Sequence, residues 1–265
     1  MMKMKLLNVK VGMGLLSVTT IFSGITPIMA ATTNVYVVDH YKGDDTEIYF
    51  PNETITYNKN GLISKMKLKA IYEPDEIRED YTYNFNTTSL FTYKKNKLSK
   101  LSVKDVISTE TYKPVYKGGL LKTLKITSQY SDSTSHSTRK YTYSKGRIAT
   151  VNGEQYTYKN GLLVDLGDDI NKYGYDSKGY LSYRSHILVG EAYDDVYFKN
   201  TYNKKGLLVS TRISKYENSD EAVPSKPVLK VTYKKIKVSK SMVKKVNAQQ
   251  NWILRNVRDD SIYNI

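Results

Sequence analysis

The stretch YTYKNGLLVDL, residues 156–166, contains the pattern that decides the fold. It begins with Y-x-Y, and because side chains alternate between the two faces of a β-strand, both tyrosine rings lie on one face. Asn160 and Gly161 follow, and such a pair favours a tight hairpin turn because glycine reaches positive φ without a Cβ clash. The leucine-rich remainder is then the return strand. The stretch therefore predicts a β-hairpin with one aromatic and aliphatic face.

The same pattern recurs along the chain and predicts a repeat protein. A tyrosine precedes each turn residue by three or four positions, and an aliphatic residue follows it by two. The turn residue is glycine in every copy but one, where asparagine replaces it because asparagine also tolerates the left-handed region. Agreement at several offsets is a strong signal of internal repetition. The turn residues are Gly61, Asn96, Gly119, Gly146, Gly161, Gly179 and Gly206.

The return strands carry a second regularity. Their aliphatic residues follow the turn residue by two and by five positions, as Leu163 and Leu166 follow Gly161. These positions have opposite parity, so a regular strand would place them on opposite faces. A bulge near the third position reconciles them, and we expect one in each hairpin. VTYKKIKV, around Tyr233, looks like a decayed eighth copy.

The repeats predict the fold class and the domain organisation. A lone hairpin is marginal in water and needs neighbours. Because the spacing of the copies varies between 15 and 35 residues, we expect an antiparallel meander, twisted or curved, rather than a solenoid. The predicted fold is mainly β with a short C-terminal helix. The predicted parts are a signal peptide (1–30), a hairpin-repeat domain (31–238), and a helix and tail (239–265).

The two ends of the chain differ from the repeats. Residues 1–30 have basic, apolar and small-residue regions in the order of a secretory signal peptide; a permanent anchor is the alternative. No later stretch is apolar enough to cross a membrane. In residues 241–257, Val243, Val246 and Gln250 fall on one helical face, with Trp252 as an anchor. We expect this helix to cap the last hairpin, with partner binding as the alternative.

The charge favours anionic partners. The chain carries a formal net charge of +15 and has no cysteine. For an exported protein the available polyanions are wall polymers, anionic lipid surfaces and acidic glycans, whereas nucleic acid is less available. Solubility alone is the other explanation of this charge. The absence of thiols excludes disulfides, thiol catalysis and thiolate metal sites.

The repeats resemble the tyrosine–aspartate (YD) repeats of RHS-type surface proteins, whose usual form is close to YDYDxxGRLxxV. Gly146-Arg147-Ile148 matches the second half of that form and Tyr173-Gly174-Tyr175-Asp176 the first, within residues 57–211. The aspartate and arginine are absent from the other copies, so the chain is a divergent relative. The resemblance implies a hairpin meander and a place at the surface of, or outside, a Gram-positive bacterium. The shell around a toxic cargo formed by large members is not carried over.

No catalytic, metal or cofactor site is expected. The histidines are far apart, and no H-E-x-x-H or G-x-S-x-G motif is present. Adjacent aspartates, such as Asp168-Asp169 and Asp194-Asp195, point to opposite faces in a strand and are poorly placed for acid–base work. A glycan-cleaving enzyme that uses them remains a third hypothesis, after the two that follow.

The tyrosines give the leading hypotheses. The chain has 25 Tyr against 5 Phe and 1 Trp, which suits a face that is apolar but partly wet. One interpretation is that the rings form cross-strand pairs that hold the sheet together. The other is that they form an open platform for flat ligands such as sugars, bordered by lysines. The leading hypothesis is a non-enzymatic envelope or glycan binder; the alternative is a carrier with a lipid or peptide in a concave face. The candidate surface residues are Tyr83, Tyr93, Tyr143, Tyr158, Tyr175, Tyr202, Lys94, Lys95 and Lys97.

Overall fold

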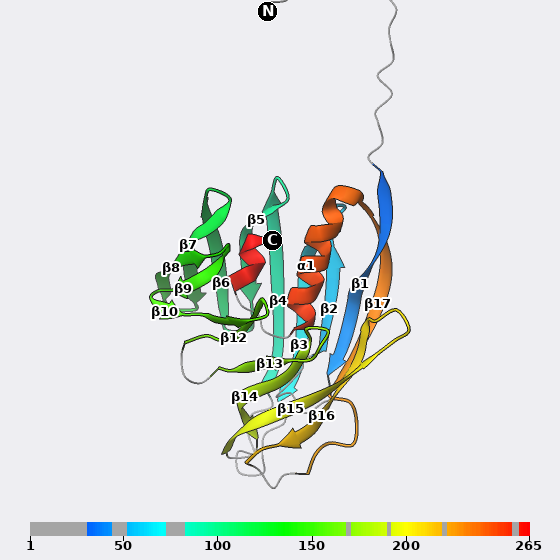
Figure 1. The fold of residues 1–265 in the computed structure, drawn as a ribbon. Helices are drawn as coiled ribbons and strands as arrows, with labels where there is room; N and C mark the ends of the chain where they lie inside the picture. Colours follow the sequence, from blue (N-terminus) through cyan, green and yellow to red (C-terminus); the bar gives the residue numbers. More distant parts are fainter. Residues whose placement is uncertain are drawn as a thin grey trace, which may run out of the picture. The chain divides into compact units, whose positions relative to one another are not determined.

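The computed structural model describes residues 31–43, 52–72, 83–167, 171–189, 192–218, 222–255 and 260–265. The predicted signal peptide lies outside the described residues, as do Asp168 and Asp169. The fold is mainly β with one short C-terminal α-helix, as predicted (Figure 1). The elements are β1 (Thr32–Gly43), β2 (Asn52–Tyr57), β3 (Ile63–Tyr72), β4 (Tyr83–Lys94), β5 (Lys97–Lys104), β6 (Ser108–Lys117), β7 (Leu120–Tyr130), β8 (Thr134–Ser144), β9 (Arg147–Val151), β10 (Glu154–Gln155), β11 (Thr157–Lys159), β12 (Leu162–Asp165), β13 (Tyr173–Tyr175), β14 (Leu181–Val189), β15 (Ala192–Tyr202), β16 (Leu208–Tyr216), β17 (Leu229–Ser239), η1 (Lys240–Met242), α1 (Val243–Leu254) and η2 (Asp260–Asn264).

Every repeat copy forms the predicted hairpin with the predicted bulge. In the first copy Tyr57 pairs with Ile63 and Thr56 pairs with Lys65, so Ser64 is the extra residue. Ser64 is the third residue after Gly61, where the parity of the aliphatic positions required a bulge. The same one-residue shift occurs in the hairpins β4–β5, β6–β7, β8–β9, β11–β12, β13–β14 and β15–β16.

The turn geometry explains why the tyrosine stands three residues before the turn residue in some copies and four in others. In the shorter turns both central residues have positive φ, as in Lys95 (φ 51°) and Asn96 (φ 58°), which is the geometry of a tight hairpin turn. In the longer turns an Asn or Asp follows the tyrosine, and its side chain bonds the turn. Asp176 Oδ1, for example, accepts hydrogen bonds from the backbone amides of Lys178 and Tyr180. Such local bonds are typical of Asx turns.

The first and last strands complete an eighth unit. β1 pairs with β17, and Tyr233 lies opposite Val38 while Thr232 lies opposite His40. Asp39 is therefore the bulged residue, and β1 acts as the return strand for the decayed copy around Tyr233. This pairing joins the two halves of the meander into one 15-stranded sheet in the order β10-β9-β8-β7-β6-β5-β4-β3-β2-β1-β17-β16-β15-β14-β13.

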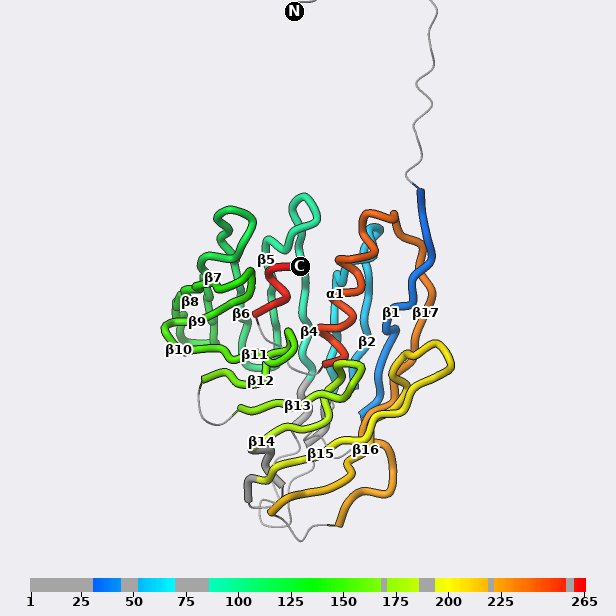
Figure 2. Tube along the Cα trace, in the orientation of Figure 1, coloured from blue at the N-terminus to red at the C-terminus, as the bar shows by residue number. Residues whose placement is uncertain are grey.

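The sheet is open and curled (Figure 2). Its two edge strands, β10 and β13, are separated along the chain only by the hairpin β11–β12, which forms a small sheet of its own. An isolated bridge between Asp165 and Lys172 links this hairpin to the segment just before β13. The concave side of the sheet faces α1 and η2 (Figure 1).

The core lies between the concave face and the C-terminal segment. The aliphatic residue two positions after each turn residue is buried in every copy, and Leu121 is fully inaccessible. Trp252, Ile253 and Ile262 from the C-terminal segment belong to the same core. The helix lies inside the curve of the sheet: Val246 packs against Val238 of the last strand, as expected, and the helix also extends along the apolar inner face to Ile63. Within the described residues, no helix is both long and apolar enough to cross a membrane.

Candidate binding surfaces

The repeat tyrosines form a hydrogen-bonded ladder on the concave side. Tyr93 donates a hydrogen bond to the carbonyl of Ile63, which follows the turn residue of the preceding hairpin by two positions. The same bond recurs in five other copies at a distance of 2.6–2.8 Å, so each of these six tyrosines fastens its hairpin to the neighbouring one. The other bonds are Tyr57 to Val38, Tyr116 to Leu98, Tyr143 to Leu121, Tyr175 to Leu163 and Tyr233 to Leu208.

The copy whose turn is at Gly206 departs from this ladder. Here Asn200 Nδ2 donates to the carbonyl of Leu181 at 3.0 Å, and the Tyr202 hydroxyl donates to Asp176 instead. Burial favours the neutral form of Asp176, but its hydrogen bonds from Tyr202, Asn200 and the backbone outweigh that effect and hold its pKa below the usual value. Asp176 thus supports both its own turn and the neighbouring hairpin.

Amide side chains of the C-terminal segment dock on this ladder. Gln249 Oε1 accepts a hydrogen bond from the Ile63 amide at 2.9 Å, and Gln249 Nε2 donates to the Tyr93 hydroxyl at 2.8 Å. Asn264 does the same with the Leu121 amide (2.9 Å) and the Tyr143 hydroxyl (3.0 Å). A third amide, Gln250, accepts from the Val38 amide at 2.8 Å. At these three bulges the strand amide therefore finds its acceptor in the C-terminal segment.

Burial raises the pKa of the inner tyrosines well above the usual value of 10.0. The neutral hydroxyls are the form that the ladder needs, since each donates its proton. The strongly buried members of this group are Tyr57, Tyr93, Tyr233 and Tyr263.

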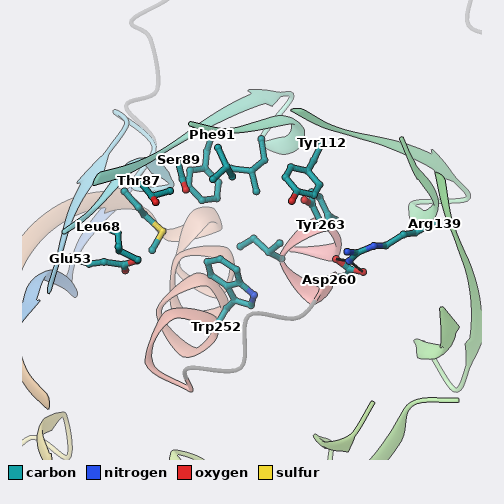
Figure 3. A pocket seen from close by; sticks show the side chains of 14 residues that line it. Glu53, Leu68, Thr87, Ser89, Phe91, Tyr112, Arg139, Trp252, Asp260 and Tyr263 are labelled. Carbon is teal, nitrogen blue, oxygen red and sulfur yellow. Dashed lines mark hydrogen bonds and ion pairs between the residues drawn. The ribbon is translucent and has the colours of Figure 1, made fainter. Parts of the chain in front are cut away.

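A cavity of about 320 Å³ lies between the sheet and the C-terminal segment (Figure 3). Phe91, Leu101 and Trp252 are among its apolar lining. Its polar lining includes two buried carboxylates, Glu53 and Asp260. Such a volume and such a mixture of apolar walls with few polar groups are typical of small-molecule sites.

The carboxylates of this cavity have partners. Asp260 Oδ2 lies 3.2 Å from Arg139 Nη1 and accepts a hydrogen bond of 2.6 Å from the Tyr141 hydroxyl. The Tyr41 hydroxyl donates to Glu53 Oε2. Both carboxylates therefore contribute to holding β1, β2, β8 and η2 together.

The structure separates the predicted surface tyrosines from the predicted surface lysines. Tyr93, Tyr143, Tyr158, Tyr175 and Tyr202 are half-buried and pack against the core. Lys94 and Lys95 are exposed, whereas Lys97 lies over the Tyr116 ring with Nζ 4.1 Å from its centroid. The side chain of Tyr83 lies outside the described residues. Because neighbours along a strand face opposite ways, a tyrosine and the lysine after it cannot share one sheet face.

The convex side carries a surface that sequence reasoning missed, which we call the outer lysine face. It consists of the outward residues of β2–β9, which are mainly lysine, threonine and serine and include the exposed Leu90 and Val115. The acidic residues of these strands, Glu53 and Glu110, both point inward: Glu53 lines the cavity, and Glu110 accepts hydrogen bonds from Tyr112 and Ser128. The described part of this face therefore has no carboxylate. Its lysines include the predicted Lys94, together with Lys65, Lys67, Lys69, Lys100, Lys104, Lys113, Lys117, Lys125 and Lys140.

The two described candidate aspartates have structural partners. Asp194 is 2% exposed, and its Oδ1 accepts hydrogen bonds from the backbone amides of Asp195, Glu217 and Asn218. Asp195 Oδ2 accepts from the Tyr183 hydroxyl at 2.9 Å, and burial together with this carboxylate raises the pKa of Tyr183 to about 12. Among the described residues, no three acidic or histidine side chains are grouped as metal ligands.

Comparison with known proteins adds no relative: no protein-family model matches the chain, and no curated protein matches it either. The class is therefore defined by the architecture itself, a meander of bulged β-hairpins curled around its own C-terminal helix. The resemblance to YD repeats stays a prediction.

Proposed function

We propose that this is an exported, non-enzymatic protein that binds an anionic polymer of the cell envelope, or an acidic extracellular glycan, through its outer lysine face. The observation that carries the proposal is the absence of any carboxylate from the described part of that face. A solubilising surface mixes both signs of charge, whereas a surface of one sign raises the local concentration of polyanions.

Cross-strand pairing supports the same function. Lys113 lies directly opposite Lys125 in the ladder between β6 and β7, and both side chains are exposed. Like charges directly opposite each other destabilise a sheet. A bound polyanion removes this repulsion, so binding and stability are coupled on this face.

The test is retention on Gram-positive cell-wall material before and after extraction of its teichoic acids. In one variant Lys65, Lys67, Lys113 and Lys125 are replaced by Gln. If each exposed contact is worth ~0.5 kcal/mol, their loss weakens binding by about 2 kcal/mol, or roughly 30-fold. Retention by the native protein should fall steeply between low and half-molar salt because salt screens exposed charges.

The matched control removes the same charge elsewhere. Lys199, Lys204, Lys226 and Lys240 are exposed and lie outside the outer lysine face; their replacement by Gln should change retention less than threefold. Equal loss in the two quadruple variants would show that net charge, not this face, governs binding. Retention that ignores salt, or that survives removal of the anionic polymers, would refute the proposal.

A carrier function is the second candidate, because the cavity in Figure 3 lies between the concave face and the helix. Its volume of about 320 Å³ suits a small organic molecule better than a long acyl chain or a peptide. A native mass spectrum of gently purified protein tests this candidate. A discrete added mass that Trp252→Ala abolishes would support it, and a spectrum of the bare chain alone would count against it.

A further inference from the structure

A second, smaller cavity lies where two consecutive hairpins meet the end of α1. It has a volume of about 180 Å³ and is lined by the turns at Gly146 and Gly161 and by Trp252. Arg147 and Arg255 also line it. None of its described lining residues carries a carboxylate, so the two guanidinium groups face a site without a counter-charge of its own.

The backbone of this cavity repeats a geometry that binds amides elsewhere in the molecule. Ile148 and Leu163 line the cavity and follow their turn residues by two positions, as Ile63 and Leu121 do in their hairpins. The amides of Ile63 and Leu121 bond to side-chain oxygens of Gln249 and Asn264. Asn264 also lines the cavity, but its amide group bonds to the Leu121 amide and the Tyr143 hydroxyl. The hydrogen bonds described for Gln249, Gln250 and Asn264 therefore do not include the amides of Ile148 and Leu163.

Arg147 is exposed and its guanidinium lies at the mouth of this cavity. The guanidinium is 5.9 Å from the centroid of the Tyr158 ring. It also lies against Gly161, where an added Cβ would approach Nη2 to 2.9 Å. These contacts place the charge of Arg147 beside the two turns that line the cavity.

We propose that this cavity binds one carboxylate-bearing sugar. A carboxylate is the planar, anionic counterpart of the amides that Gln249 and Asn264 present, so one oxygen can accept from a strand amide. The other oxygen faces the guanidinium groups, which bind carboxylates through paired hydrogen bonds. Trp252, Tyr158 and Tyr175 supply aromatic walls, which suit the apolar face of a sugar ring. The volume limits the ligand to a single residue.

This site does not depend on the outer lysine face, because it lies among different residues on the concave side of the sheet. The two proposals therefore fail separately: the quadruple lysine variant should lose wall retention and keep this site, and arginine variants should do the reverse.

The experiment is titration calorimetry of the full chain with D-glucuronate at physiological salt, with D-glucose and inorganic phosphate as comparison ligands. We expect glucuronate to bind at least about tenfold more tightly than either one, because glucose lacks the charge that the guanidinium groups bind and phosphate lacks the ring that the aromatic walls contact. Arg147→Gln and Arg255→Gln should each weaken glucuronate binding by about tenfold or more.

The control is Arg212→Gln, because Arg212 is exposed and does not line the cavity. It should leave glucuronate binding unchanged, and the thermal melts of all three variants should stay close to the native one. Equal affinity for glucose, equal affinity for phosphate, no binding of glucuronate, or equal weakening by Arg212→Gln would each overturn the proposal.

Discussion

Replacing the buried Gln249 of α1 by Ala should destabilise the fold, because this side chain is hydrogen-bonded to two different strands. Gln249 is 1% exposed. Its side chain joins a strand amide, that of Ile63, to a ladder hydroxyl, that of Tyr93. Truncation leaves the Ile63 amide in the core without this acceptor.

The magnitude follows from these contacts. A buried donor without a partner costs about 1–3 kcal/mol, and the lost bond to Tyr93 adds about 1 kcal/mol. We therefore expect the free energy of unfolding to fall by about 3 kcal/mol. For a chain of this size, that shift lowers the melting temperature by about 6–12 °C. Adding Tyr93→Phe should show a coupling energy of about 1 kcal/mol, because the two groups touch.

Urea denaturation followed by circular dichroism measures this change, and Asn247→Ala is the control. Asn247 is an amide on the same helix but is exposed, so its replacement should change stability by less than about 0.5 kcal/mol. Equal effects of the two substitutions, or a Gln249→Ala protein as stable as the native one, would refute the proposed docking of α1.

Two further predictions concern the turns and the ladder. Gly61→Ala should lower the free energy of unfolding clearly more than Gly119→Ala. Both glycines have positive φ, but a Cβ on Gly61 would lie 2.5 Å from Val238 Cγ1, whereas nothing lies within 4 Å of a Cβ on Gly119. Equal losses in the urea midpoint of the two variants would contradict this. Burial raises the pKa of the four inner tyrosines in the folded state, whereas in the unfolded chain they ionise near pH 10. The free energy of unfolding should therefore be unaffected by these groups below pH 10 and should fall above it, by up to about 5 kcal/mol per pH unit for the four together. Tyrosinate absorbance and loss of circular dichroism should therefore appear together in an alkaline titration, and ionisation of all tyrosines near pH 10 without unfolding would exclude the ladder.

Local chemistry made the hairpins predictable. A turn needs a residue that tolerates positive φ, and the parity of the aliphatic positions around Gly61 or Gly161 requires a bulge whatever the rest of the chain does. The predicted bulge position is occupied in every copy, as by Ser64 in the first. These features involve residues within a few positions of one another, so the sequence carries them in full.

The candidate surface was less predictable because it depends on which way the sheet curls. Tyr93 and Lys94 are neighbours in sequence, yet the ring turns toward α1 while the lysine is exposed. The predicted surface grouped the two residues, whereas side-chain alternation along β4 puts them on opposite faces. Only the curved sheet decided that the tyrosine face would be enclosed and the lysine face left open.

The sequence by itself determined the number of repeat hairpins, their turns, their bulges and a C-terminal helix, because short-range geometry specifies each of them. Only the tertiary structure decided that β1 would complete the copy around Tyr233, and that Gln250 would bond to Val38, which is 212 residues away in the chain. The curvature accumulated over many strands decides which distant residues come into contact, and no short stretch of sequence specifies that curvature.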